Sequence, residues 1–135
     1  MAVDTRTAVA NLANTARAMR PMVPAKDFKV SKQFYEDLGF QPRVLTDGLV
    51  EMSLGPYSFI LQDYYVPQWA DNMVMHLRVS DVSLWWKHIV ALDLTSRYGV
   101  KTSAPCLEDW GLVARAVDPS WMLWRIAESP ASEPS

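Results

Sequence analysis

Apolar and polar residues alternate at the start of the chain in a way that predicts a strand, a helix and three more strands. Val23 and Ala25 alternate with other residues, as the side chains of a strand do. Residues 29–40 then show helical spacing, after Asp27 as a helix cap and up to Gly39 as a helix end. Three later segments alternate again and are predicted as strands: 41–47, 49–55 and 57–65. Two turn-forming dipeptides separate them, Asp47-Gly48 and Gly55-Pro56.

The same order of elements begins again in the second half of the chain. Residues 72–81 read as a strand ending at Asp81, which matches Asp27 as a helix cap. Residues 82–94 follow as a helix with a broad apolar face of five side chains: Val82, Trp85, Trp86, Ile89 and Leu92. Residues 97–109 read as a strand or loop, and 110–118 and 121–128 as two strands. The repeat lies in the pattern of elements, not in residue identity.

These patterns predict an α+β fold of two paired βαβββ modules. The first module is predicted at 20–66, a linker at 67–72 and the second module at 73–128. Residues 1–19 carry apolar side chains at helical spacing and are expected to form an amphipathic helix that packs on the domain or on a second subunit. Residues 129–135 have the composition of a disordered tail.

Composition narrows the class of protein. The chain has 135 residues, 50% hydrophobic and 21% charged, as in an ordinary globular domain. A net charge of −2 gives no reason to expect nucleic acid as a partner. No apolar run approaches the roughly 18 residues of a transmembrane helix. The single cysteine, Cys106, excludes an internal disulfide and a multi-cysteine metal site. We expect a cytoplasmic protein with neither a nucleic-acid nor a membrane partner.

The segment "AKDFKVSKQFYEDLGF" (25–40) resembles the opening helix of the vicinal oxygen chelate superfamily, which includes glyoxalase I, extradiol dioxygenases and bleomycin-resistance proteins. The segments "HLRVSDV" (76–82) and "WGLVARAVDPSWMLWRI" (110–126) resemble the second module of its bleomycin-resistance-like branch. The resemblance covers roughly residues 20–128. It implies a curved, cleft-bearing mixed sheet with the helices on its outer face.

The resemblance also implies where a metal would bind. Enzymes of the superfamily hold a divalent metal with four side chains, one from the first and one from the last strand of each module. The matching first-strand positions here are Arg20 and Val74, and the last-strand position of the second module is Arg125. Arginine stays protonated and valine has no donor atom, so none of the three can bind a metal. Only Gln62 keeps a plausible ligand type, and we therefore expect no metal cofactor.

Other catalytic arrangements have weak support. His76, Glu51 and Gln62 are predicted to line the cleft and offer an alternative, shifted metal site, although nearby arginines would repel a cation. Glu51 and His76 also leave open a metal-free acid–base reaction. Cys106 lies beside Pro105 in a predicted loop, and no motif supplies a histidine partner for it. His88 is predicted on the surface of the second helix and is assigned no role.

Basic side chains are predicted on the cleft face of the strands. In the strand up to Val79 the apolar set is Met73, Met75, Leu77 and Val79, which leaves Val74, His76 and Arg78 on the cleft face. The same alternation places Arg125 opposite Met122, Trp124 and Ile126. With Arg20 and Arg115, these arginines can bind a carboxylate or phosphate. The alternative is an internal salt bridge, for example from Arg125 or Arg78 to Glu51.

Six tryptophans in 135 residues are an unusual number. Trp110, Trp121 and Trp69 can stack on a planar ligand, or they belong to the core. The bleomycin-resistance-like branch implies sequestration of a drug in a groove between the two subunits of a homodimer. Bleomycin itself is cationic, and arginines in the groove would repel it.

The first hypothesis is a homodimeric, metal-independent protein that binds and sequesters a small aromatic or anionic molecule. We predict no catalytic residues and eight ligand-binding residues: Glu51, Gln62, His76, Arg78, Trp110, Arg115, Trp121 and Arg125. The alternative is a glyoxalase- or dioxygenase-type enzyme (a lyase, isomerase or dioxygenase) with a displaced divalent-metal site. A third hypothesis is a ligand-sensing or partner-binding module that docks through the N-terminal helix.

Overall fold

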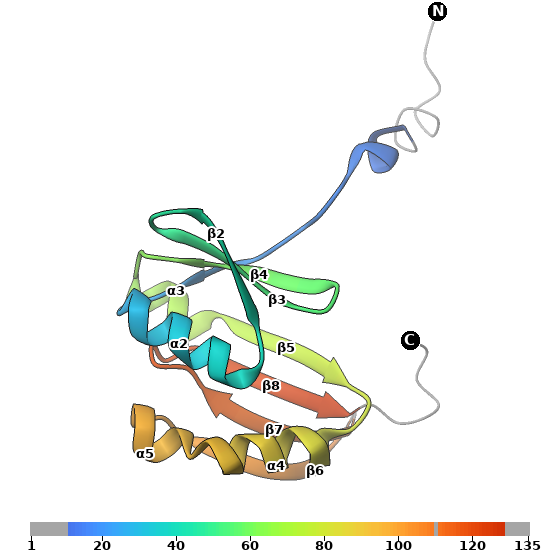
Figure 1. Cartoon of the computed structure of the whole chain (residues 1–135). Coiled ribbons are helices and arrows are strands. Elements are labelled where there is room, and N and C mark those ends of the chain that lie inside the picture. Colours follow the sequence, from blue (N-terminus) through green and yellow to red (C-terminus); the bar gives the residue numbers. More distant parts are fainter. Residues whose placement is uncertain (1–10, 110, 129–135) are drawn as a thin grey trace, which may run out of the picture.

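The computed structural model describes residues 11–109 and 111–128. They form two βαβββ modules, each with a four-stranded sheet (Figure 1). Each sheet is mixed, because its first strand runs parallel to the last strand of the same module. The predicted α+β fold of two repeated modules is confirmed. In this part of the chain no helix is long and apolar enough to cross a membrane.

The first module begins with β1 (Met22–Pro24) and ends with β4 (Tyr57–Gln62). Between them lie α2 (Phe28–Leu38), β2 (Gln41–Thr46) and β3 (Leu49–Leu54). The strand order is β1-β4-β3-β2, so β1 and β2 are the edge strands. Cross-strand pairing places Arg43 opposite Glu51, and the two side chains therefore share one face of the sheet.

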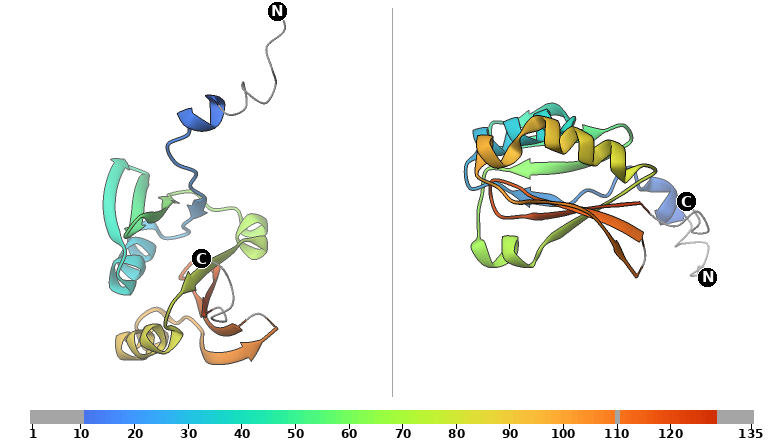
Figure 2. Two further views of the ribbon diagram at one scale, coloured as in Figure 1. Left: turned by 90° about the vertical axis from the view of Figure 1, so that its right-hand side faces the viewer. Right: turned by 90° about the horizontal axis from the view of Figure 1, so that it is seen from below.

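The second module repeats this plan after the short helix α3 (Pro67–Asn72). Its elements are β5 (Val74–Val79), α4 (Val82–Leu92), α5 (Leu94–Tyr98), β6 (Thr102–Glu108), β7 (Gly111–Val117) and β8 (Leu123–Glu128). The order β5-β8-β7-β6 is equivalent to that of the first sheet. Helix α4 covers one face of this sheet (Figure 2, right).

The helix boundaries follow the predicted capping residues. Asp27 accepts a hydrogen bond from the backbone N–H of Val30 at 3.3 Å, and Asp81 accepts one from Leu84 at 3.1 Å. Gly39 follows α2 with φ of 119°, a conformation that glycine adopts without strain at Cβ. Short-range sequence signals therefore decide where both main helices begin and where α2 ends.

The core lies between the helices and the inner faces of the sheets. Its main aromatic cluster combines residues of both modules: Phe34, Tyr35, Phe40, Phe59 and Trp124. Phe59 and Trp124 have ring centroids 5.5 Å apart, and Phe40 and Trp124 5.6 Å apart. Because Trp124 belongs to β8 and the other four to the first module, this cluster packs the modules against each other.

A buried polar network also joins the two modules. Tyr35 donates a hydrogen bond to Asp118 Oδ2 at 2.5 Å and accepts one from Trp124 Nε1 at 2.8 Å. Asp118 Oδ1 accepts the backbone N–H groups of Ser120 and Met122, at 2.8 and 2.9 Å. The turn between β7 and β8 is therefore connected directly to α2.

Residues 67–72, predicted as the linker between the modules, form α3, with Pro67 in its first turn. Two features differ from the sequence-based expectations. The predicted helix 82–94 ends at Leu92, because Asp93 has a left-handed φ of 52°, and α5 follows it. Cys106, expected in a loop, lies in β6 and is exposed. Strand pairing with β7 overrides the local effect of Pro105 there.

Residues 11–19 extend away from the two modules (Figures 1 and 2). Residues 11–15 are helical, and Leu12 and Met19 are 69% and 97% exposed. This segment does not pack on its own domain. The alternative, that the N-terminal segment packs on a second subunit, therefore stays a prediction. Residues 1–10 and 129–135 lie outside the described residues.

Candidate functional site

Each sheet has one face that packs on the core and an opposite face, which we call the open face. On β8, Trp124 and Ile126 are buried, and Arg125 between them points to the open face. On β5, Met75 and Leu77 pack on the core, which leaves exposed His76 and Arg78 on the open face. This burial agrees with the strand alternation inferred from the sequence.

Basic groups stand side by side across the open face of the second sheet. His76, Arg125 and Arg115 occupy paired positions on β5, β8 and β7. Glu108 ends β6 and binds both arginines: Oε2 accepts from Arg125 Nη2 at 2.7 Å, and Oε1 accepts from Arg115. The hydrogen bond from Arg115 is the largest effect on the pKa of Glu108 and, together with the two arginine charges, holds it below its ordinary value despite partial burial. We call Glu108, Arg115 and Arg125 the second-module cluster.

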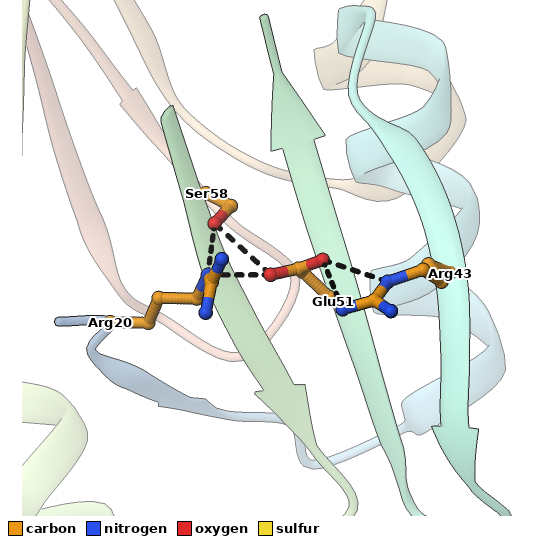
Figure 3. A network of polar contacts seen from close by, with 4 residues as sticks. All are labelled: Arg20, Arg43, Glu51 and Ser58. Carbon is orange, nitrogen blue, oxygen red and sulfur yellow. Dashed lines mark hydrogen bonds and ion pairs between the residues drawn. The ribbon is translucent and has the colours of Figure 1, made fainter. Parts of the chain in front are cut away.

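The first sheet carries an equivalent group on its open face, the first-module cluster of Arg20, Arg43, Glu51 and Ser58 (Figure 3). Glu51 Oε2 lies 2.5 Å from Arg20 Nε, and Oε1 lies 3.0 Å from Arg43 Nη2. Ser58 donates a hydrogen bond to Glu51 at 3.3 Å. Burial acts to raise the pKa of Glu51, but the hydrogen bond from Arg43 and the charges of both arginines outweigh it and lower the pKa.

These contacts correct one detail of the expected salt bridge. The alternative considered from the sequence joined Arg125 or Arg78 to Glu51, for example, whereas the partners of Glu51 are Arg20 and Arg43, and Arg125 pairs with Glu108. The reason is topological. Glu51 belongs to the first sheet, so Arg20, just before β1, and Arg43 of β2 reach it, and Arg125 belongs to the second sheet.

Neither Arg43 nor Glu108 was singled out from the sequence. Arg43 and Glu51 are placed almost symmetrically about the Asp47-Gly48 turn, so hairpin register would have paired them. Glu108 ends a strand whose extent the sequence left open between strand and loop. Its relation to Arg125 also depends on the β8-β7-β6 order, which local sequence does not give.

The metal-ligand positions that the family resemblance implied do not suit a metal here. Arg20 and Arg125 are cations already engaged with glutamates, and Val74 has no donor atom. Of the four implied positions, only Gln62, at the end of β4, carries a side chain of a type that binds metals. Within residues 11–109 and 111–128, no three His, Cys, Asp or Glu side chains gather as a metal site would require.

The structure also does not assemble the shifted site of His76, Glu51 and Gln62. Glu51 and Gln62 belong to the first sheet and His76 to the second. The carboxylate of Glu51 already accepts from two arginines and Ser58, so binding a cation there means breaking those contacts. His88, predicted at the surface, is exposed and lies with Nε2 3.0 Å from the carbonyl oxygen of Leu38.

The tryptophans divide between core and surface. Trp124 is buried in the shared aromatic cluster, whereas Trp69 and Trp121 are 62% and 58% exposed. Trp121 has φ of 72°, a left-handed conformation that is rare for a bulky side chain. Trp110, predicted to bind ligand, lies outside the described residues. Trp121 and Trp69 therefore supply accessible ring surface.

A cleft of about 540 Å³ lies between the modules. One wall comes from the ends of β3 and β4 and includes Leu54, Tyr57 and Phe59, and the other comes from β5. His76 and Arg78 also line it, so the apolar cleft borders the basic open face. Its volume lies within the range of about 300–1,000 Å³ typical of small-molecule sites. Leu54, Tyr57 and Phe59 were not singled out from the sequence, because apolar residues in a strand give no sign of lining a cleft.

No family model and no curated protein matches this sequence. Solved structures do resemble it. A bleomycin-binding protein complexed with bleomycin is 25% identical with a TM-score of 0.71, and the match covers 85% of this chain and 100% of that one. The bleomycin resistance determinant encoded on transposon Tn5 is 25% identical with a TM-score of 0.72, covering 84% and 98%. TnmS3, an antibiotic-binding protein from Streptomyces sp. CB03234, is 22% identical with a TM-score of 0.66, covering 86% and 99%.

These likenesses extend over nearly the whole of each solved chain, so they include both modules. They agree with the opening-helix and second-module motifs noted in the sequence, and with the strand order of both sheets. The chain therefore has the fold of the vicinal oxygen chelate superfamily, in the form found in bleomycin-binding proteins.

Proposed function

We propose that the protein binds and sequesters a small aromatic or anionic molecule, without a metal and without a chemical step. The observation that carries this proposal is the charge of the open faces. Four arginines in the two clusters stand against two glutamates, Glu51 and Glu108, and Arg78 adds a further positive charge. An excess of positive charge on these faces attracts anionic ligands.

The aromatic part of the proposal rests on the cleft and, outside it, on the exposed Trp69 and Trp121. Tyr57 offers an exposed ring to the cleft, the buried rings of Phe59 and Trp124 lie behind its wall, and His76 and Arg78 stand at its border. A ligand with a planar body and an anionic group fits both environments, because aromatic contacts favour the body and arginines favour the oxyanion. Similarity to a bleomycin-binding and an antibiotic-binding protein supports binding as the activity.

We further propose that the binding form is a homodimer. Within the described residues the two sheets are separate, and β1 and β5 are edge strands of their sheets. An edge strand offers unpaired backbone groups to a second chain. A second copy that covers these edges would bring open faces of different subunits together and give the exposed segment 11–19 a surface on which to pack.

A binding screen with product analysis tests this function. Quenching of tryptophan fluorescence, followed by calorimetry, is expected to find planar compounds that bind with micromolar or lower Kd. Arg125→Gln is expected to weaken binding of the anionic members of the set, whereas Lys87→Gln, a change at an exposed position of α4, leaves their binding unaffected. Bound compound released by denaturation is expected unchanged in mass. A chemically altered product refutes sequestration.

Metal analysis separates binding from the enzyme alternative. Protein dialysed against Zn²⁺, Ni²⁺, Mn²⁺ or Fe²⁺ is expected to retain much less than one metal per chain, and its affinity for an identified ligand is expected to be the same with and without a chelator. One metal per chain, lost in His76→Ala, contradicts metal independence and favours a glyoxalase- or dioxygenase-type enzyme. Light scattering at several concentrations reports the expected dimer.

A further inference from the structure

The two arginine–glutamate clusters differ in how firmly they hold their carboxylate. Glu51 lies within β3, an interior strand, is 6% exposed, and accepts from Arg20, Arg43 and Ser58. Glu108 is the last residue of β6, an edge strand, and its side chain is 27% exposed. The carboxylate of Glu51 is therefore enclosed by the sheet, whereas that of Glu108 is partly exposed at the end of an edge strand.

The arginines of the second-module cluster form a ready receptor for an oxyanion. Arg115 and Arg125 are directly paired across β7 and β8, so both guanidinium groups start from a rigid part of the sheet. Each binds a different oxygen of Glu108. Proteins commonly bind carboxylates and phosphates through paired hydrogen bonds from guanidinium groups to two oxygens of the anion.

The surroundings place this receptor where a ligand can reach it. His76 is the next residue in the same cross-strand row, and it also lines the cleft between the modules. The row His76–Arg125–Arg115 therefore leads from the apolar cleft to the carboxylate of Glu108. Partly exposed ion pairs contribute little net stability, so exchange of one oxyanion for another at this position costs the fold little.

We propose that the carboxylate of Glu108 occupies the binding site of the ligand's anionic group when no ligand is bound, and that a ligand carboxylate or phosphate displaces it from Arg115 and Arg125. This inference rests on the proposed function, because it assigns the charged end of the same ligand. It makes Glu108 a built-in competitor: molecules without an oxyanion leave it in place. The two arginines then give selectivity for anions, and competition from Glu108 sets how tightly an anion must bind the arginines in order to displace it.

The test compares matched aromatic probes on Glu108 variants. Calorimetry measures the binding of 2-naphthoate, 2-naphthyl phosphate and the neutral 2-naphthamide to the wild type and to Glu108→Gln. Removing the competing carboxylate is expected to strengthen binding of at least one oxyanion probe by about tenfold or more, because a charge-assisted pair becomes available to the ligand. Binding of 2-naphthamide is expected to change by less than about twofold in either direction, because it does not compete with Glu108. The two oxyanions distinguish a carboxylate ligand from a phosphate ligand.

Two control variants separate local competition from general charge. Glu108→Asp keeps a carboxylate at the site and is expected to retain most of the competition. Glu36→Gln removes one negative charge from α2 and is expected to leave all three affinities near wild type. In the wild type, the ¹⁵Nε signals of Arg115 and Arg125 are expected to shift when 2-naphthoate, but not 2-naphthamide, is added.

Each outcome decides the inference. Unchanged or weaker oxyanion binding by Glu108→Gln overturns it, as does an equal gain for the oxyanions and the amide, or an equal gain in Glu36→Gln. Binding of 2-naphthamide to the wild type keeps the proposed function even when the inference fails. If none of the probes binds Glu108→Gln at millimolar concentration, the inference is overturned, and the broader ligand screen then decides the function separately.

Discussion

Trp121 combines an exposed aromatic side chain with a left-handed backbone. Its φ is 72° and 58% of its surface is exposed, so little packing offsets the conformational strain. A left-handed conformation costs an L-residue about 1–2 kcal/mol. Strain of this kind is kept where function needs it, and an accessible tryptophan beside the strands of the second sheet is suited to stacking on a planar ligand.

Replacing this residue by glycine is therefore expected to stabilise the fold. Trp121→Gly relieves the strain, and the greater chain entropy of unfolded glycine takes back about 0.5–1 kcal/mol, which leaves a gain of about 0.5–1 kcal/mol. Chemical denaturation measures this free energy of unfolding, and the same variant is expected to bind planar ligands more weakly.

Trp69 provides the matched control. It is 62% exposed, close to the value for Trp121, but it lies in α3 with helical backbone. Trp69→Gly is expected to lower the free energy of unfolding by about 1 kcal/mol, because glycine disfavours helices. A loss of stability in Trp121→Gly similar to that in Trp69→Gly contradicts the strain argument.

Through the pKa of Glu51, the contribution of the first-module cluster to folding stability depends on pH. This pKa is lowered in the folded protein from an ordinary value of 4.5, so the contribution to stability is present above that value and is lost as the pH falls through the folded pKa. Glu51→Gln is expected to reduce stability at neutral pH and to flatten the decline of stability in acid. Urea unfolding from about pH 7 to pH 3 measures both effects. Glu36→Gln on α2 serves as the control, and an equally steep acid decline in Glu51→Gln contradicts the assignment.

At the scale of elements, α4 depends on its cap. Asp81 accepts from the backbone N–H of Leu84 at 3.1 Å, which satisfies one of the free donors in the first turn. Asp81→Ala is expected to cost about 1 kcal/mol of unfolding free energy, measured by thermal or urea unfolding. Ser83→Ala, at an exposed position in the same turn, is expected to stay within about 0.5 kcal/mol of wild type. Equal losses in the two variants mean that the cap is not the cause.

The same elements show which parts of the structure were predictable. Asp27, Gly39 and Asp81 act within one helical turn, so their effect could be inferred from neighbouring residues, and strand alternation correctly put Trp124 and Ile126 in the core. The predicted repeat of βαβββ modules followed from these local signals.

The partners within the site were less predictable, because they depend on strand order. Arg20 reaches Glu51 because β1 pairs with the non-consecutive strand β4, which lies beside β3, whereas Arg125 reaches Glu108 across the intervening strand β7. Non-consecutive strands become neighbours through the whole fold, and no short segment encodes that relation. The alternation could therefore show that arginines share a face, but not which glutamate each arginine binds.

At the scale of the whole molecule, the Tyr35–Asp118–Trp124 network connects the modules. Tyr35 comes from α2, and the other two residues come from the second module. Asp118 is almost fully buried, and burial, the largest effect, raises its pKa above the ordinary 3.8, while the hydrogen bond from Tyr35 lowers it. The phenol of Tyr35 thus stabilises the charged form of a carboxylate that burial disfavours.

Tyr35→Phe removes that hydroxyl and tests the connection. It leaves Asp118 Oδ2 and Trp124 Nε1 without this partner, and is expected to cost about 2–3 kcal/mol at neutral pH. Tyr98→Phe, which removes a hydrogen bond to Asp37 at a half-buried site, is expected to cost about 0.5–1 kcal/mol. Urea unfolding of both variants supplies the comparison.

The pH dependence of the Tyr35→Phe loss separates the hydrogen bond from simple packing. Without the phenol, the pKa of Asp118 rises further. A group whose folded pKa is raised contributes stability below its unfolded pKa and loses that contribution as the pH rises through the folded value. The deficit of Tyr35→Phe relative to wild type is therefore expected to be smaller near pH 4, where the loss of the hydrogen bond from Trp124 remains, and to grow toward pH 7. A deficit independent of pH means that the hydroxyl acts through packing and the bond with Trp124 alone, and that the charge of Asp118 plays no part in holding the two modules together.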